Sequence, residues 1–583
     1  MSTAADIYAY DHSVTADQNE TLFSGKKWTY IQDSTSNTGQ YQGQIQFNLS
    51  TISSQAAFVN WEEAVIELPI KLQILNGGNA PFIPAGLPTV DQLVPKAGAW
   101  HFIDSVQVVI DGVTVQTNQV HENVNATFKA LTEWSIDDQL KYGATSNFAI
   151  DRFEPPIPVM PQSLDNIPTA NFVTTGASTD PGVNVLGEFG MANTFVNAGA
   201  RERARFTAFK QTASSLAYDI MGNNANVQIA AKPQVWTYSG LDPVAPGGPI
   251  YVAHYLAAIK LADISDYFKK CPMQKNTKGF IYINYNSSST TIVSKAAGGI
   301  IGPLTIDSVS NNMNFGNTCP ILYNLTSAEL ASAYTTRTGL SVPAAVTTLT
   351  VTADVNGTKT DGTGLSPSQT FSRLLVPTYT PNPMADGALT QKKTFRYFER
   401  MTNKFMVLPN SSFTWTLTNG IANPRKLFMQ PIITSWATSG TVMADAINPL
   451  RSPFTTIPAT TSPFASIKQL QVTVGNIPCW NNPIDFGYDM FLQEMAQSGV
   501  DGGLDDTTSS GLLSQQSWES LHRFIAVDVG RRLPSEDGAS KSIIVSGTNN
   551  TAFPLTIYYH IWRDAIATVD TAMGTVSQAP VQK

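Results

Sequence analysis

Hydrophobic and polar positions alternate with a period of two between residues 66 and 74. One side carries the apolar residues Ile66, Leu68, Ile70, Leu72 and Ile74, and the other carries Glu67, Pro69, Lys71 and Gln73. This pattern predicts a β-strand with one buried and one exposed face. Proline lacks the N–H that a ladder uses, so Pro69 indicates an edge strand, a bulge, or a position whose nitrogen faces away from a partner.

Further strands are predicted along the chain, and turn-forming pairs separate them. Asp111-Gly112 stands between two apolar runs and favours a hairpin with a type I′ turn. The predicted strands besides 66–74 include 44–49, 106–110, 113–115, 251–261 and 280–285. Together these patterns predict an all-β protein whose sheets are mostly antiparallel.

Helices are expected to be few and short. Val124, Phe128 and Leu131 share one face of a predicted helix, and Thr326 to Glu329 match a capping box. Segments 261–270 and 512–521 also read as helices of one to three turns. None is long enough to organise the fold alone.

The chain contains a faint internal repeat. Phe128 follows Gly112 by sixteen residues, and Phe491 follows Gly475 by the same interval. The segment starting at Tyr251 also resembles the one starting at His522 in rhythm. We therefore expect two domains, residues 1–295 and 296–583, with the Thr/Gly-rich stretch 347–363 as a long loop inside the second.

Composition excludes several classes of protein. The chain has 583 residues, only 14% of them charged, and a net charge of −8. Four acidic residues precede the first base, Lys26, so there is no basic arm and we expect no strong binding of nucleic acid. No apolar region follows Met1 and no long apolar run occurs, so we expect neither a cleaved secretory signal nor a transmembrane helix.

No catalytic, cofactor-binding or metal-ligating residue is nominated. The histidines lack metal-ligand spacing; they are His12, His101, His121, His254, His522 and His560. His121-Glu122 begins like a zinc-protease helix, but its second ligand is missing. Nucleophile elbows and phosphate loops are absent from the sequence. Cys271, Cys319 and Cys479 are too far apart for a metal knuckle, and we expect free thiols.

Charged clusters are interpreted structurally. Two acidic stretches, at 354–361 and 501–506, lack the ligand spacing of an EF-hand and are read as turns. Basic clusters are expected to form inter-subunit salt bridges or to line a particle interior, although aromatic residues beside the second could contact nucleic acid. Their residues are Arg201, Arg203 and Arg205; Lys392, Lys393, Arg396 and Arg400; and Arg531 with Arg532.

Several segments, in order, resemble the major capsid proteins of double jelly-roll viruses, nearest to those of virophages and Polinton-like viruses. They include FVNWEEAVIELPI from Phe58, WHFIDSVQVVIDG from Trp100, FVNAGARERARFTAF around Arg201, SIKQLQVTVG from Ser466 and LTIYYHIWRDAIATVDTAMG from Leu555. The resemblance implies two consecutive eight-stranded jelly rolls, three copies of which form a trimeric capsomer of pseudo-sixfold shape.

We therefore expect a non-enzymatic capsid subunit without cofactors, made in the host cytoplasm and located in the virion. Its expected partners are itself, penton and minor capsid proteins, while contact with an internal membrane is left open. Two alternatives remain at this point. One is a single jelly-roll capsid protein of a small single-stranded DNA virus, and the other is a carbohydrate-binding or glycan-cleaving β-sandwich with exposed Trp and paired carboxylates.

Overall fold

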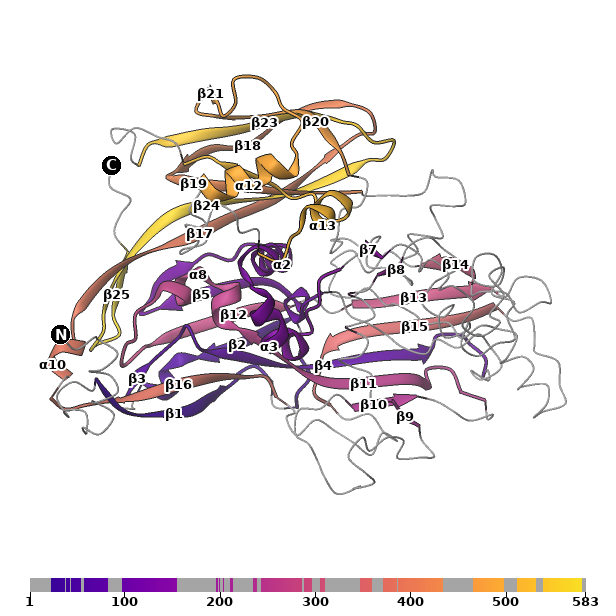
Figure 1. Ribbon diagram of the computed structural model, residues 1–583. Coiled ribbons are helices and arrows are strands. Elements are labelled where there is room, and N and C mark those ends of the chain that lie inside the picture. Colours follow the sequence, from indigo (N-terminus) through magenta and orange to yellow (C-terminus); the bar gives the residue numbers. More distant parts are fainter. Residues whose placement is uncertain are drawn as a thin grey trace, which may run out of the picture.

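A computed structural model describes most of the chain outside its longest loops (Figure 1). The described residues are 22–81 except 37, 42 and 54–56; 97–151; 243–285; 346–358; 371–433 except 385; 465–497; 511–530; and 538–578. Short segments at 153–154, 196–197, 210–212, 234–237, 288–295 and 305–309, with 199 and 203, are also described.

The first half of the fold is a sandwich of two antiparallel sheets. One sheet contains the order β1-β16-β4-β11, and the other has the order β2-β12-β5-β6. Their bounds are β1 Phe23–Gln32, β2 Gln44–Asn48, β4 Val65–Asn76, β5 Ile103–Ile110, β6 Val113–Gln116, β11 Pro249–Lys260, β12 Gly279–Tyr285 and β16 Arg373–Pro381. Apolar side chains from the two inner faces form one buried core.

The second half repeats this arrangement. One sheet has the order β17-β24-β19-β22, and the other has the order β18-β23-β20-β21. Their bounds are β17 Lys392–Val407, β18 Ser412–Ala422, β19 Pro424–Ile433, β20 Ile467–Val474, β21 Ile477–Pro478, β22 Ile525–Asp528, β23 Ser540–Asn549 and β24 Leu555–Asp570. A separate hydrophobic core lies between these two sheets.

Both sandwiches are jelly rolls. If the eight strands of each are lettered B to I in chain order, both have one sheet B-I-D-G and one sheet C-H-E-F. The predicted double jelly roll is therefore confirmed by strand connectivity. A single jelly roll with long loops, the first alternative, does not have this topology.

The strand predicted at residues 66–74 is confirmed as part of β4. Ile66, Leu68, Leu72 and their alternating neighbours are almost completely buried. β4 is a central strand, because β11 pairs along one side and β16 and then β15 (Val346–Val355) pair along the other.

Pro69 occupies the position where β4 changes partner. Pairing with β16 ends at Glu67, and pairing with β15 begins at Ile70. The carbonyl oxygen of Pro69 accepts a hydrogen bond from the Asn356 nitrogen at 2.8 Å, so the proline nitrogen faces the same side. Pro69 therefore lies neither in an edge strand nor at a bulge, and its nitrogen points into the interval between the pairing with β16 and the pairing with β15.

The internal repeat is also borne out by the fold. Asp111 and Gly112 (φ 50° and 79°) turn between β5 and β6, and Gly475 and Asn476 (φ 55° and 68°) turn between β20 and β21. Both are tight turns between strands E and F. The matched phenylalanines then lie in helices at equivalent places, α2 (Glu122–Glu133) and α12 (Tyr488–Gln497), between strands F and G. The segments at Tyr251 and His522 lead into or form the two G strands.

The sheets divide at a different place from the expected boundary at residues 295 and 296. β16 is the I strand of the first jelly roll, and β13, β14 and β15 extend the same sheet beyond β4. The stretch expected to be a loop at 347–363 instead begins as strand β15. The sheet pairing of β16 with β1 joins segments so distant in sequence that local patterns do not reveal it.

The predicted helices are confirmed within the described residues, and α3, α10 and α12 are found in addition. Segment 261–270 forms two short helices, and α3 was not expected, although Ser135 and Asp138 form its capping box. The capping box predicted at 326–329 lies outside the described residues. The bounds are α3 Ile136–Ser146, α7 Leu261–Ile264, α8 Asp266–Lys270, α10 Asp386–Leu389 and α13 Gln515–Ser520.

The remaining elements are short or extend the sheets. They are β3 Phe58–Val59, β7 Phe153–Glu154, β8 Val196–Asn197, β9 Lys210–Thr212, β10 Gln234–Thr237, β13 Ser288–Lys295, β14 Thr305–Val309, β25 Val576–Gln578, and the 3-10 turns Leu49–Ile52 and Ala99–Phe102. Figure 1 shows the two jelly rolls as separate layers, with α2 lying between them.

Candidate functional site at the junction of the jelly rolls

Helix α2 fills the space between the two jelly rolls. It belongs to the first, yet Phe128 stacks on Phe428 of the second, with ring centroids 3.9 Å apart and planes inclined by 11°. Phe524 and Trp562 meet the same ring edge-on. Nearly every residue of α2 is buried, as expected for a helix with packing partners on all sides.

Arg400 of β17 binds the segment that leads into α2. One guanidinium nitrogen, Nη2, forms an ion pair with Glu122 and donates to the Gln119 carbonyl at 3.1 Å. The other, Nη1, lies 3.3 Å from the His121 carbonyl and 3.3 Å from Nδ1 of His560. A single side chain of the second jelly roll therefore satisfies several polar groups of the first.

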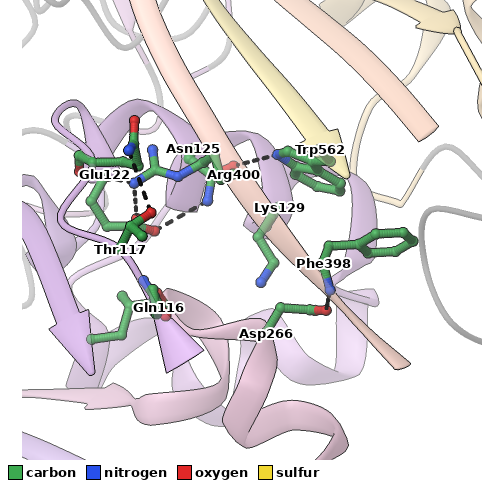
Figure 2. Close-up of a pocket in the computed structure, with 11 residues that line it drawn as sticks. Gln116, Thr117, Glu122, Asn125, Lys129, Asp266, Phe398, Arg400 and Trp562 are labelled. Atoms are coloured by element: carbon green, nitrogen blue, oxygen red, sulfur yellow. Dashed lines mark hydrogen bonds and ion pairs between the residues drawn. The ribbon is translucent and has the colours of Figure 1, made fainter. Parts of the chain in front are cut away.

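Other polar contacts cross the same junction. The Trp562 indole donates to Asn125 Oδ1 at 3.2 Å, and the Phe398 backbone nitrogen donates to Asp266 Oδ2 at 2.7 Å (Figure 2). The Tyr397 hydroxyl donates to the Val115 carbonyl at 2.9 Å. These bonds fix the register of one jelly roll on the other, because each joins a side chain in one to a defined atom of the other.

An open cleft lies beside these contacts. Lys129 reaches into the cleft, and its ammonium group is 3.5 Å from the Ala262 carbonyl. Both carboxylates of the lining are engaged in the junction, Glu122 with Arg400 and Asp266 with Phe398 (Figure 2). The lining residues therefore hold the jelly rolls together, and none of them forms a nucleophile–base pair.

Burial controls the protonation of the junction. It raises the pKa of Glu122, against the opposing effect of Arg400, and lowers the pKa of His560 well below its usual value. Burial, aided by the charges of Lys404 and Arg400, also lowers the pKa of His121 to about 4. Both imidazole rings are consequently neutral at physiological pH.

The histidines considered in the sequence have structural surroundings where they are described. His101, His254, His522 and His560 are buried, and His121 precedes α2 with a left-handed φ of 61°. His12 lies outside the described residues. Among the described residues, no group of His, Cys, Asp or Glu is arranged to hold a metal ion.

The expectation for the basic clusters is wrong for two arginines. Arg203 is completely buried and forms an ion pair with Asp151 at 2.7 Å, and Arg400 belongs to the junction. Neither faces another subunit or a particle interior, because each satisfies an acidic group within its own chain. Lys392, Lys393 and Arg396 are exposed on β17, whereas Arg201, Arg205, Arg531 and Arg532 lie outside the described residues.

The remaining candidate residues form no further site within the described part of the chain. Asp354 lies in strand β15 and not in a turn, whereas the rest of its acidic stretch beyond 358 and the stretch 501–506 are outside the described residues. Cys271 is a buried free thiol, Cys479 is partly exposed, and Cys319 is not described. Within the described ranges, no helix is long and apolar enough to cross a bilayer.

The sequence patterns include the junction residues, but they do not predict that these residues contact one another. Arg400 was one member of a basic cluster, and His121-Glu122 was a failed zinc motif. The structure shows that Glu122, Asn125 and Lys129, which share one face of α2, are buried although they are polar. Such a face needs polar partners from elsewhere in the chain, but periodicity does not identify them.

Comparison with known proteins gives distant structural similarities. No protein-family model matches the chain, and no curated protein matches its sequence. A chain of the Sputnik virophage structure aligns over 97% of this chain and 90% of its own, with 10% identity and a TM-score of 0.46. The mavirus major capsid protein covers 100% and 95%, with 11% identity and a TM-score of 0.41. The Faustovirus major capsid protein covers 97% and 94%, with 8% identity and a TM-score of 0.41.

Proposed function

We propose that this protein is a structural, non-enzymatic major capsid subunit. It forms trimers of pseudo-hexameric shape that tile an icosahedral shell, and it resides in the virion after synthesis in the host cytoplasm. Its partners are other copies of itself, together with penton and minor capsid proteins. We place the domain division between β16 and β17, so that each domain contains one complete set of eight strands.

The contact between the two jelly rolls of one chain is the observation that supports the proposed trimer. Helix α2 of the first jelly roll covers the outer face of β17, β24 and β19 in the second. The contact joins two different surfaces, so it is heterologous. Among the described residues, the surfaces equivalent to these two are the outer B-I-D-G face of the first jelly roll and the α12 side of the second.

The outer B-I-D-G face of the first jelly roll has the character of a protein contact. Trp28 and Tyr30 of β1, which corresponds to β17, are 54% and 57% exposed on that face. Lys26 lies 5.2 Å from the Trp28 ring, and Arg373 lies 5.5 Å from the Tyr30 ring. Exposed aromatic side chains bordered by cations are typical of interface residues.

Repetition of the same contact closes a ring. If α12 of one copy covers the outer face of β1 and β16 in the next, six jelly rolls from three chains complete a cycle. Each interface is then expected to bury considerably more than the roughly 1,600 Å² of a standard protein–protein complex. Hexagonal outlines of this kind pack side by side without gaps, as a shell requires.

Light scattering coupled to size exclusion tests the proposal. We expect a species of three times 63.0 kDa for the wild-type chain, and hexagonal capsomers in electron micrographs. The double variant Trp28→Ala/Tyr30→Ala should be a folded monomer, judged by an unchanged circular dichroism spectrum. Ile477→Ala is the matched control, because Ile477 is also exposed but lies in strand F.

The proposal is contradicted by a wild-type chain that stays monomeric at high concentration. It is also contradicted if the Ile477 control dissociates the trimer as strongly as the Trp28/Tyr30 variant. A glycan array with clear, carboxylate-dependent binding would instead favour the carbohydrate-binding alternative.

A further inference from the structure

Two histidines approach the junction from opposite jelly rolls. The ring of His560, on β24, is fully buried and stacks on Phe428 at a centroid distance of 4.4 Å. The ring of His121, at the start of α2, meets Tyr558 edge-on at 4.9 Å. The His560 ring is therefore covered by the contact that joins the two jelly rolls and becomes hydrated only when that contact opens, whereas the His121 ring is partly buried by it.

The hydrogen bond to Arg400 specifies a neutral His560. A guanidinium has donors only, so Nδ1 of His560 accepts from Nη1 of Arg400, and the ring proton resides on Nε2. Protonation of His560 would remove this acceptor and place an imidazolium 3.3 Å from the guanidinium. Nε2 has no hydrogen-bond partner among the described residues, so the added charge would gain no compensating bond there.

Five other charged groups lie around the two histidines. The groups that face the two histidines are Arg400 and Lys404 of β17, Glu122 and Lys129 of α2, and Asp104 of β5. At neutral pH they provide three cations and two carboxylates. Burial raises the pKa of Glu122 and the pKa of Asp104, so these two carboxylates take up protons more readily in the closed junction than in water and act against the histidines as the pH falls.

We propose that the junction between the two jelly rolls is an acid-sensitive contact: protonation of His560 and His121 releases α2 from the outer face of β17, β24 and β19. Each jelly roll keeps its own core, because the inner faces of the sandwiches contain neither histidine. This is a property of the single chain and goes beyond its role in assembly. In a shell, it would loosen each subunit from within when the surroundings become acidic.

The direction of the pH effect follows from linkage. Desolvation lowers the pKa of both histidines in the closed junction, whereas a hydrated histidine titrates near pH 6.5. At the two histidines, the closed state therefore binds fewer protons than the open state below about pH 6.5. The contribution of the histidines to the stability of the junction is fully present above that pH and is lost progressively as the pH falls toward the lowered values.

Hydrogen exchange followed by mass spectrometry measures this opening directly. Peptides covering 117–126 report on the junction, and peptides covering β4, β20 and β24 report on the two sandwiches, because β24 is paired with β17 and with β19 inside the second jelly roll. A histidine that is neutral in the closed junction and hydrated in the open junction raises the equilibrium constant for opening by up to about 30-fold when the pH falls from 7.5 to 5.0. Exchange times are scaled for the intrinsic effect of pH, so the increase reflects opening alone.

Substitution of the histidines separates their titration from their packing. His560→Asn retains an acceptor for Arg400, and His121→Asn suits the left-handed backbone, which Asn adopts readily. The double variant should lose most of the acid response. His254→Asn is the matched control, because His254 is also buried, with its pKa lowered to about 4, but lies in β11 away from the junction.

The inference is overturned if the junction peptides of the wild-type chain open equally at both pH values. It is also overturned if the cores open together with the junction, or if His254→Asn removes the acid response as fully as the double variant does. If His560→Asn does not fold, the single His121→Asn variant must still reduce the response. Because the measurement is made on unassembled chains, its outcome is independent of trimer formation.

Discussion

The ring of Phe128 lies parallel to the ring of Phe428, with 3.9 Å between their centroids, although the two residues belong to different jelly rolls. This stack sits at the centre of the junction, and the polar contacts of Arg400, Trp562 and Phe398 surround it. An apolar centre with a polar surround is the arrangement found in stable protein interfaces. The two jelly rolls are thus joined as firmly as two subunits of a complex.

Loss of the stacked Phe128 ring should lower the stability of the folded chain. Phe128→Ala removes a fully buried side chain from the junction and is expected to lower the free energy of unfolding by about 3–5 kcal/mol. Urea denaturation monitored by tryptophan fluorescence measures the change. Leu140→Ala on the neighbouring helix α3 is the control: Leu140 is 78% exposed, so its loss should change stability by less than about 0.5 kcal/mol. Equal effects of the two variants would contradict the packing described.

The ion pair of Arg400 and Glu122 should show strong coupling. Arg400→Met leaves Glu122 buried without its cation, and we expect a loss of about 3–5 kcal/mol. Glu122→Gln in the same chain removes the stranded charge and should restore part of that loss. A double-mutant cycle from urea denaturation at pH 7.5 gives the coupling energy. Additive effects of the two substitutions would show that the pair does not stabilise the junction.

The turn between strands E and F of the first jelly roll needs a residue that tolerates positive φ. Gly112 has a φ of 79°, and a methyl group added there would meet no atom within 4 Å. Gly112→Ala should therefore cost about 1 kcal/mol from backbone strain alone. Gly387→Ala in α10 meets the same open space without a positive φ, so it should be neutral or slightly stabilising. Thermal unfolding of both variants distinguishes strain from steric contact.

Asp354 should reduce stability at neutral pH. Burial raises its pKa from 3.8 to about 6, so the folded chain binds more protons than the unfolded chain between these values. Its unfavourable contribution is fully present above pH 6 and disappears as the pH falls toward 4. Asp354→Asn is expected to stabilise the chain by about 1–3 kcal/mol at pH 7.5.

The stability difference between this variant and the wild type, measured at several pH values, checks the prediction. The difference should shrink as the pH falls through 6. A difference that stays constant from pH 7.5 to 4.5 would show that Asp354 ionises normally in the folded chain.

Local patterns in the sequence were sufficient for the individual strands. The alternation from Ile66 to Ile74 identifies β4, and Asp111-Gly112 identifies the hairpin of β5 and β6, because both patterns depend on neighbouring residues. The matched spacing of Phe128 and Phe491 reflected the equivalent helices of the two jelly rolls. Patterns within a segment thus carried the class of fold and its duplication.

Contacts between segments that are distant in sequence cannot be predicted from such local patterns. β16 is the I strand of the first jelly roll, but nothing within residues 373–381 shows that it pairs with β1. Arg400 and Glu122 are far apart in sequence, and each looks like an ordinary surface charge by itself. The pairing of β16 with β1 and the junction therefore required the three-dimensional arrangement.

Pro69 has a consequence for how this protein can change over evolutionary time. Because β4 exchanges one neighbour for another at that residue, the pairing with β16 that closes the jelly roll ends before the added strands β13 to β15 begin. Material can be gained or lost between β12 and β16 without altering the register of the barrel itself. This segment is consequently a natural insertion point, where a foreign peptide could be grafted while the architecture around it is preserved.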